Sequence, residues 1–120
     1  MTCRGIRGAI TVESNTESAI VDATTELLTT LFFKNTVEIP DIVSIFFTAT
    51  PDLNAAFPAL AARKMTLDQT PLMCCQEIDV PGGLKMCIRV LVHVNSQTPI
   101  HDIQHVYLND AVRLRPDIVS

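Results

Sequence analysis

The amino-acid sequence predicts an α+β fold, in which a mixed β-sheet of about five strands packs on one long helix. Three observations support this prediction. Short apolar runs with strand-like spacing recur along the chain, turn residues separate them, and a single long segment repeats its apolar residues at helical spacing. With 120 residues the chain can bury one hydrophobic core but not two, so we expect a single domain over residues 1–120.

The first predicted strand covers residues 3–12. Alternation along this strand places Ile6, Ile10 and Val12 on one face, which we expect to lie in the core. The opposite face carries Arg7 between small residues. Space therefore remains beside the Arg7 guanidinium.

A long helix is predicted from about residue 16 to residue 34. Ser14 and Glu17 have the spacing of a capping box, which favours a helix start at this point. Asn35 and Pro40 indicate where the helix ends. The apolar stripe that should face the core consists of Ile20, Ala23, Leu27, Leu28 and Leu31.

The remaining elements are shorter. Their residues predict a strand over 42–49, a helix near 55–64, strands over 71–77 and 86–95, a short helix near 99–104 and a last strand over 105–108. The continuous apolar run 42–49 is typical of a strand covered on both faces. One long helix and a few helical turns cannot cover both faces of the sheet, so its uncovered face should bury against another subunit.

Charge and apolar patterning exclude two classes of partner. The chain has a formal net charge of −4 and no basic stripe, which argues against nucleic-acid binding. No apolar stretch approaches the roughly 18 residues needed to span a bilayer, so no membrane partner is expected. Arg4 and Arg7 interrupt the N-terminal segment where a signal peptide would need an apolar core. We therefore expect a cytoplasmic protein.

The cysteines and histidines show no pattern of a metal site. Without a secretory signal, we expect the four cysteines to be reduced and mostly buried rather than paired in two disulfides. Adjacent Cys74 and Cys75 would point to opposite faces of a strand, and no C-x-x-C motif accompanies them. The spacing of His93, His101 and His105 fits neither a metal site nor a triad, so we assign all three to surfaces. No cofactor or metal is predicted.

Two arginines are the sharpest candidates for chemistry. Arg7 and Arg89 each lie within a predicted strand, where a guanidinium needs a carboxylate partner or a wet cleft. One interpretation is a pair of structural ion pairs, for example with Glu77 or Asp79. The other is an anion site, with both guanidinium groups aimed from adjacent strands into a pocket floored by Gly5 and Ala9. Tyr107, the only tyrosine, could add a donor or could simply end a core ring.

Four segments, in order over essentially the whole chain, resemble the monofunctional trimeric chorismate mutases of the Bacillus type. They are RGIRGAITVE, TATPDLNAAFPALAAR, CCQEIDVPGGLKMCIRV and HVYLNDAVRLRPD. The resemblance implies a homotrimer whose three sheets form a pseudo-α/β-barrel, with active sites in clefts between subunits. It also implies rearrangement of chorismate to prephenate without a cofactor.

The resemblance further implies a role for individual residues. Arg7 and Tyr107 would hold the enolpyruvyl carboxylate of chorismate. Arg89 would donate to the ether oxygen, where negative charge develops, and Glu77 would accept from the ring hydroxyl. Further substrate contacts would come from the main chain around Cys74 and from the cleft wall, namely from Met73, Cys74, Cys75, Gln76, Phe57, Arg63 and Arg115.

One departure from the family pattern concerns affinity. Position 60 is leucine, where the family commonly has lysine, so one cation near the ring carboxylate is absent. Two other functions stay open at this point. A trimeric deaminase of the Rid type has a similar architecture and also binds a small carboxylate through an arginine. A non-catalytic sensor of an aromatic-pathway metabolite would bind without turnover.

Overall fold

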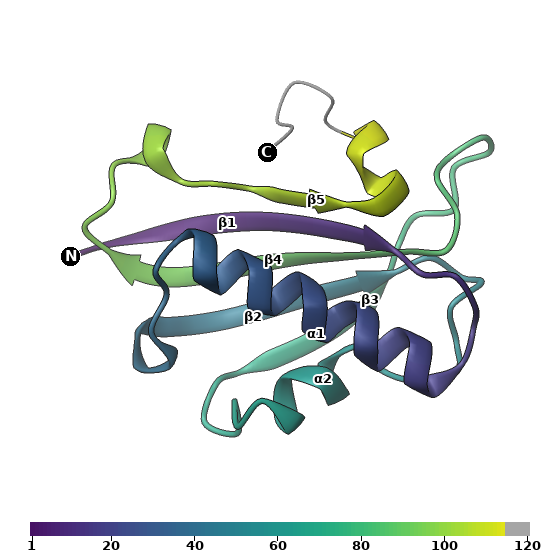
Figure 1. Ribbon diagram of the computed structural model, residues 1–120, viewed down its shortest axis with the longest axis horizontal. Coiled ribbons are helices and arrows are strands. Elements are labelled where there is room, and N and C mark those ends of the chain that lie inside the picture. Colours follow the sequence, from purple (N-terminus) through teal and green to yellow (C-terminus); the bar gives the residue numbers. More distant parts are fainter. Residues whose placement is uncertain (115–120) are drawn as a thin grey trace.

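The computed structural model describes residues 1–114 (Figure 1). Five strands, two α-helices and three short 3₁₀ helices make up this part of the chain. In order they are β1 (Thr2–Thr11), α1 (Glu17–Lys34), η1 (Ile39–Asp41), β2 (Ile42–Ala49), α2 (Ala59–Lys64), β3 (Leu72–Gln76), β4 (Cys87–Ser96), η2 (Ile100–Asp102), β5 (Val106–Leu108) and η3 (Asn109–Leu114).

The strands form one mixed sheet in the order β3-β2-β4-β1-β5. The central strand β4 runs antiparallel to both of its neighbours, β1 and β2. Each edge strand is parallel to the strand it pairs with, β5 to β1 and β3 to β2. The prediction of an α+β fold with a mixed five-stranded sheet is therefore confirmed.

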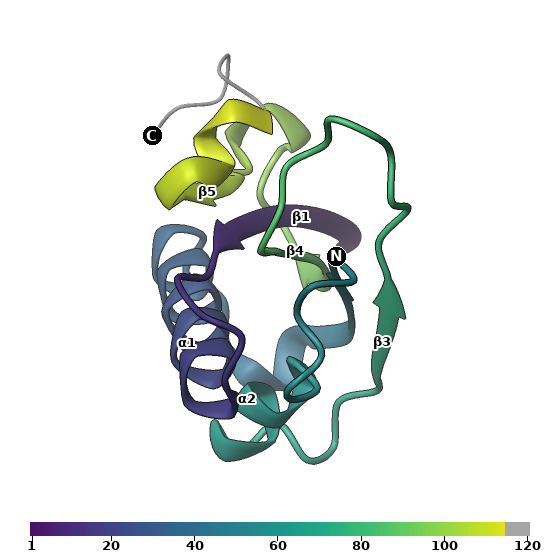
Figure 2. The ribbon, with the colours of Figure 1, turned by 90° about the vertical axis from the view of Figure 1, so that its right-hand side faces the viewer.

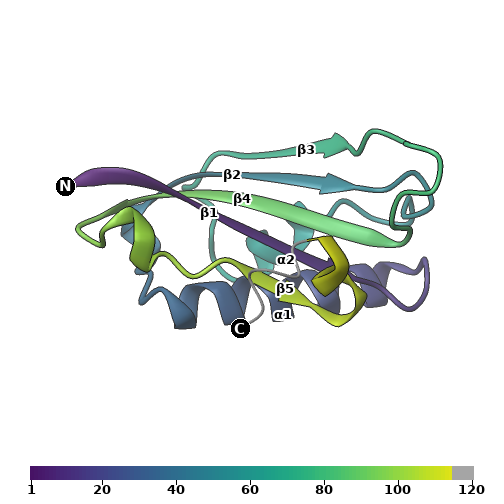
Figure 3. The same cartoon turned by 90° about the horizontal axis from the view of Figure 1, so that it is seen from above.

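Both α-helices lie on the same side of the curved sheet (Figures 2 and 3). Alternation along β4 follows the prediction, since Ile88, Val90, Val92 and Val94 are buried towards the helices. Gly8 explains how closely α1 approaches β1. A Cβ atom at that position would lie 3.1 Å from Leu27 Cδ1 and 3.2 Å from Leu31 Cδ1. The core therefore fills the space between α1 and the sheet.

The opposite side of the sheet is largely open, and we call it the open face. Phe46 of β2 and Met73 of β3 are paired neighbours on this side, with 38% and 55% of their surface exposed. The expectation that the run 42–49 is covered on both faces is therefore wrong for the single chain. Its apolar composition is instead split, because Ile45 and Phe47 point into the core while Phe46 does not.

The helix boundaries differ from the sequence predictions in two places. The N-cap of α1 is Thr16 rather than Ser14, because Thr16 Oγ1 accepts the hydrogen bond from the Ala19 amide. The neighbouring Asn15 is engaged elsewhere, holding the 50–58 loop through the amides of Asn54 and Ala55. The second helix begins at Ala59 rather than near residue 55, since this loop occupies the intervening residues.

Two further expectations need correction. All four cysteines are free, but Cys3 and Cys75 are exposed and Cys74 is only half-buried, so most of the thiols are not buried. Both exposed thiols belong to the open face. The 3₁₀ helix η3 was not predicted, and it covers the end of that face near β5. Within residues 1–114, no helix has the length and apolar character to cross a membrane.

Candidate active site

Four strands place a row of side chains across the sheet. Thr48 of β2 lies opposite Arg89 of β4, and Arg89 lies opposite Ala9 of β1. Ala9 in turn pairs with Tyr107 of β5. Because Ile88 points into the core, its neighbour Arg89 points to the open face. The strand register therefore brings residues from distant parts of the sequence onto one surface.

Glu77 joins this row from the end of β3. Its amide donates to the Ala49 carbonyl at 2.9 Å, which continues the β2–β3 pairing by one residue. Its carboxylate accepts a hydrogen bond from Thr48 Oγ1 and lies 3.6 Å from Arg89 Nε. The ion pair that the sequence left open is therefore present between Arg89 and Glu77.

This ion pair does not satisfy Arg89. Its Nε atom is buried and has no hydrogen-bond partner in the described part of the chain. A buried donor without an acceptor costs about 1–3 kcal/mol, and more when the group is charged. Arg89 Nε is therefore a buried donor that lacks a hydrogen-bond acceptor within residues 1–114.

Arg7 and Tyr107 lie on the same face, next to Arg89. Arg7 is opposite Leu91 in the neighbouring row, two residues along β1 from Ala9, and its side chain is exposed. The Tyr107 hydroxyl is buried and, within residues 1–114, lacks a hydrogen-bond partner. Tyr107 and Ala9 belong to one buried cluster with Cys87 and Ala111, so Ala9 does not form an open pocket floor as expected.

A cavity of about 580 Å³ adjoins Arg89 and Glu77. It lies between the turn at residues 50–52 and the loop 77–85, and Cys87 also lines it. Burial raises the pKa of the Cys87 thiol to about 11, despite the opposing effect of the nearby Arg89 guanidinium. Cys87 is therefore a buried residue at the base of this cavity, with 2% of its surface exposed.

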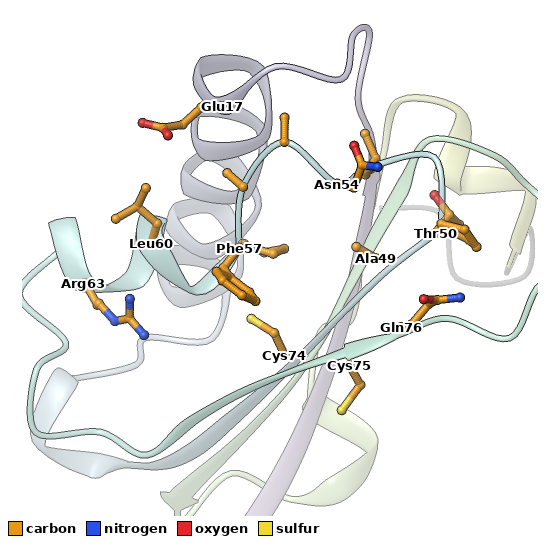
Figure 4. Close-up of a pocket in the computed structure, with 15 residues that line it drawn as sticks. Glu17, Ala49, Thr50, Asn54, Phe57, Leu60, Arg63, Cys74, Cys75 and Gln76 are labelled. Atoms are coloured by element: carbon orange, nitrogen blue, oxygen red, sulfur yellow. The ribbon is translucent and has the colours of Figure 1, made fainter.

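A second cavity of about 580 Å³ lies on the helix side of β3 (Figure 4). Phe57 and Arg63 project towards it from the 50–58 loop and α2, and the Cys74 side chain points to Phe57. Cys75 also lines this cavity, but its side chain points away from Phe57. Burial raises the pKa of the Cys74 thiol, with a partly opposing effect of the Ala59 amide and Arg63. A thiolate nucleophile is therefore disfavoured at Cys74.

The predicted site residues thus fall into two groups within one chain. One group, on the open face, contains Arg7, Glu77, Arg89, Tyr107 and Met73. The other, around the helix-side cavity, contains Phe57, Arg63, Cys74 and Gln76. Cys75 also lines that cavity, but its thiol lies on the open face with Thr48. Arg115 lies outside the described residues. In residues 1–114 no cluster of three or more metal-ligating side chains occurs.

Two polar supports of the open-face group were missed from the sequence. Thr48 donates a hydrogen bond to the Glu77 carboxylate. Alternation in 42–49 was the available signal, because it places Thr48 on the same face as Phe46. Asp52 accepts hydrogen bonds from the Met86 amide at 3.0 and 3.2 Å, where Met86 has a φ of 52°. Asp52 therefore fixes the chain just before β4, and no local sequence signal indicates this partner.

Comparison with known proteins identifies the family. The sequence profile described as chorismate mutase type I matches residues 3–118. Chorismate mutase AroH from Bacillus subtilis is 48% identical over 119 residues, which is 98% of this chain and 94% of that protein. Chorismate mutase AroH from Thermus thermophilus is 48% identical over 118 residues, covering 98% and 97%.

A solved structure leads to the same family. A chorismate mutase from Clostridium thermocellum superposes with a TM-score of 0.88 and is 56% identical, covering 89% of this chain and 96% of that one. The sequence profile, the full-length relatives and the fold agree, and the chain belongs to the chorismate mutase type I family.

Proposed function

We propose that this protein rearranges chorismate to prephenate in a cleft on the open face of the sheet. The observation that carries the proposal is the buried Nε of Arg89, which has no hydrogen-bond partner among residues 1–114 and lies beside Glu77 and Arg7. The rearrangement is unimolecular and pericyclic, so it requires donors and shape rather than a nucleophile. Family membership removes the Rid-type deaminase as an alternative.

In this proposal, Arg7 and Tyr107 bind the enolpyruvyl carboxylate. The exposed guanidinium supplies charge, and the buried hydroxyl of Tyr107 supplies a directed donor whose hydrogen bond is not made within residues 1–114. Because β1 and β5 are paired neighbours, both groups approach the same carboxylate from adjacent strands. A donor pair fixed in this way favours the compact conformer that can react.

Arg89 would supply the main electrostatic stabilisation. As the ether C–O bond breaks, its oxygen gains negative charge, and the Arg89 guanidinium donates to it. Glu77, which lies 3.6 Å from Arg89 Nε, would accept from the ring hydroxyl. Even the low end of enzymatic acceleration, about 10⁶-fold, requires about 8 kcal/mol of differential stabilisation. A charged donor already fixed on β4 beside Glu77 is the strongest single source available to this site.

We further propose that the cleft is completed by a neighbouring subunit of a homotrimer. Phe57 and Arg63 lie on the helix side of β3, away from the open face of their own chain. On the open face, Met73, Phe46 and Leu91 form a paired row next to Arg7 that is partly exposed. Packing of this row against a second copy would bury apolar surface. It would also place Phe57 and Arg63 of the second copy beside the open face of the first.

Subunit complementation tests this arrangement. Arg89→Ala and a Phe57→Ala/Arg63→Ala double variant, each weakly active alone, would be co-expressed with different affinity tags. Mixed trimers should regain activity, because one of the three interfaces in each mixed cyclic trimer combines two intact halves. Mixed trimers of Arg89→Ala and Arg7→Ala serve as the control, since both defects lie in the same half and no interface is intact.

A chorismate assay tests the function itself. Chorismate absorbance should decay in the presence of the protein, and this activity should survive a metal chelator. Chorismate binding without turnover would instead support the sensor function.

Light scattering tests the proposed trimer. The measured molecular mass should be three times the 13.2 kDa of the chain. A stable monomer at micromolar concentration would contradict the shared cleft.

A further inference from the structure

The strand that carries Tyr107 is unusually short. β5 has three residues, lies at the edge of the sheet and pairs with β1 through Gly8–Val106, Ala9–Tyr107 and Ile10–Leu108. Strand register is usually fixed by a row of main-chain hydrogen bonds and by the burial of one face. Three pairs provide few such bonds, so the position of Tyr107 needs additional support.

His105 provides this support at the start of β5. The Arg7 amide donates a hydrogen bond to His105 Nδ1 at 2.9 Å, one residue before the first main-chain pair of the two strands. Because the amide is the donor, Nδ1 must be the acceptor, and the neutral imidazole carries its proton on Nε2. A side chain two residues before Tyr107 is therefore bonded directly to the main chain of Arg7.

The other end of β5 is also tied to β1 by side chains. Asn109 Nδ2 donates to the Thr11 carbonyl at 3.1 Å, and the Asp110 amide donates to Thr11 Oγ1 at 3.0 Å. Asn109 has a φ of 56°, a region that asparagine tolerates better than most residues. Only the His105 bond, of these three, ends on a residue with a proposed role in substrate binding.

We propose that His105 is a positioning residue for the substrate carboxylate. Its Nδ1 fixes the register of β5 on β1, and the register sets the spacing between the Arg7 guanidinium and the Tyr107 hydroxyl. Two donors that share one carboxylate must be placed to within about 0.5 Å. This inference rests on the proposed function, because it takes Arg7 and Tyr107 as ligands of the same carboxylate.

Three substitutions separate the acceptor atom from the ring. In His105→Asn, the amide oxygen lies close to the place of Nδ1, whereas in His105→Gln it lies closer to Nε2. His105→Ala removes the acceptor altogether. The Ala and Gln variants should raise KM for chorismate about three- to tenfold with a smaller change in kcat, as expected for loss of one hydrogen bond that acts on ground and transition states alike.

The Asn variant should keep KM close to that of the wild-type protein, and so should the control His101→Ala, an exposed histidine on η2. Recovery by asparagine would separate positioning from a general effect of the ring on stability. A KM unchanged in His105→Ala would overturn the proposal, as would an Asn variant as impaired as the Ala variant.

A second measurement does not depend on chorismate. Amide hydrogen exchange of Arg7 in the free protein should become faster in the Ala and Gln variants and stay slow in the Asn variant. Unchanged exchange in His105→Ala would show that the bond does not hold the strands together, and the proposal would be wrong. If the wild-type protein fails to turn over chorismate, the proposed function is wrong. Faster exchange of the Arg7 amide in His105→Ala would still show that His105 holds β5 on β1.

Discussion

On the open face, Arg89 lies in the middle of β4, whereas on the helix side Phe57 and Arg63 lie on a loop and on a helix of six residues. Arg89 is flanked by two hydrogen-bonded strands, and its side chain is partly buried beside Glu77. Phe57 is 71% exposed, and its loop is anchored by the hydrogen bonds of Asn15. The open face therefore suits groups that must not move during the reaction, and the helix side suits groups that enclose the substrate.

The largest effect is expected at Arg89. Replacement by citrulline, which is neutral and nearly the same shape, should lower kcat by at least about 10²–10³, since a preorganised donor to the transition state is lost. Arg89→Lys should also be poor, because a point charge cannot reproduce the direction of the planar fork. Pre-steady-state binding and turnover would separate Kd from kcat.

Arg63→Ala is the matched variant on the helix side. There we expect KM to rise more than kcat falls, because in the proposed cleft the exposed Arg63 would attract the ring carboxylate in the ground and transition states alike. The comparison fails if the citrulline variant raises Kd as much as it lowers kcat/KM. Arg89 would then be an ordinary carboxylate anchor.

The sequence predicted the fold well where the pattern was local. The alternation in 86–95 placed Arg89 and the buried valines on opposite faces, and the structure agrees. The 3₁₀ helix η3 was missed because its six residues show no helical repeat, and it begins at Asn109, which has a positive φ. Local patterns therefore predict which face a side chain takes, but they do not predict what covers that face.

The candidate site was predicted less completely, because its geometry depends on contacts between distant segments. Arg7 and Arg89 were selected as charged residues within strands, and the β1–β4 register then sets their spacing. The bond from the Arg7 amide to His105 joins residues 98 positions apart, and no local pattern indicates it. The separation of the site residues into an open-face group and a helix-side group likewise could not be predicted without the strand order.

The buried thiol at the open-face cavity should make the stability of the protein depend on pH. The pKa of Cys87 is raised from 9.0 to about 11, so the folded state keeps a proton that the unfolded state loses. This contribution to stability is complete below about pH 9 and is lost as pH rises through 11, which amounts to about 2–3 kcal/mol at 1.36 kcal/mol per pKa unit. Urea unfolding at pH 8 and pH 11 would measure it.

Cys87→Ser is the control for this titration, because a hydroxyl does not ionise in the same range. The serine variant should be less stable at pH 8 but should lose less stability between pH 8 and pH 11 than the wild-type protein. Parallel losses in the two proteins would show that other groups cause the alkaline transition. The titration of the buried Cys87 thiol would then not account for the alkaline loss of stability.

A smaller effect is expected at position 60 on the helix side. Leu60 lines the cavity with Arg63, so Leu60→Lys would add a second cation near the ring carboxylate. KM should fall by a factor that corresponds to about 0.2–1 kcal/mol, with little change in kcat and a smaller effect at high salt. Leu60→Gln controls for polarity without charge. An unchanged KM at low salt would mean that position 60 does not face the substrate.

The smallest effect is expected at Cys74, which lies in β3 between the open face and the helix side. Its side chain points to Phe57 on the helix side, so we expect its main chain rather than its thiol to contact the ring hydroxyl. Burial raises the pKa of this thiol, and the thiol is therefore protonated at neutral pH and should react slowly with alkylating agents. Cys74→Ala should keep kcat and KM within about twofold of the wild-type values, the range of a substitution that removes no specific contact. Cys75→Ala, which removes the thiol on the other side of the strand, provides the comparison. Complete loss of activity in a folded Cys74→Ala protein would show that the thiol itself takes part. The contact with the ring hydroxyl would then come from the Cys74 side chain and not from the backbone of β3.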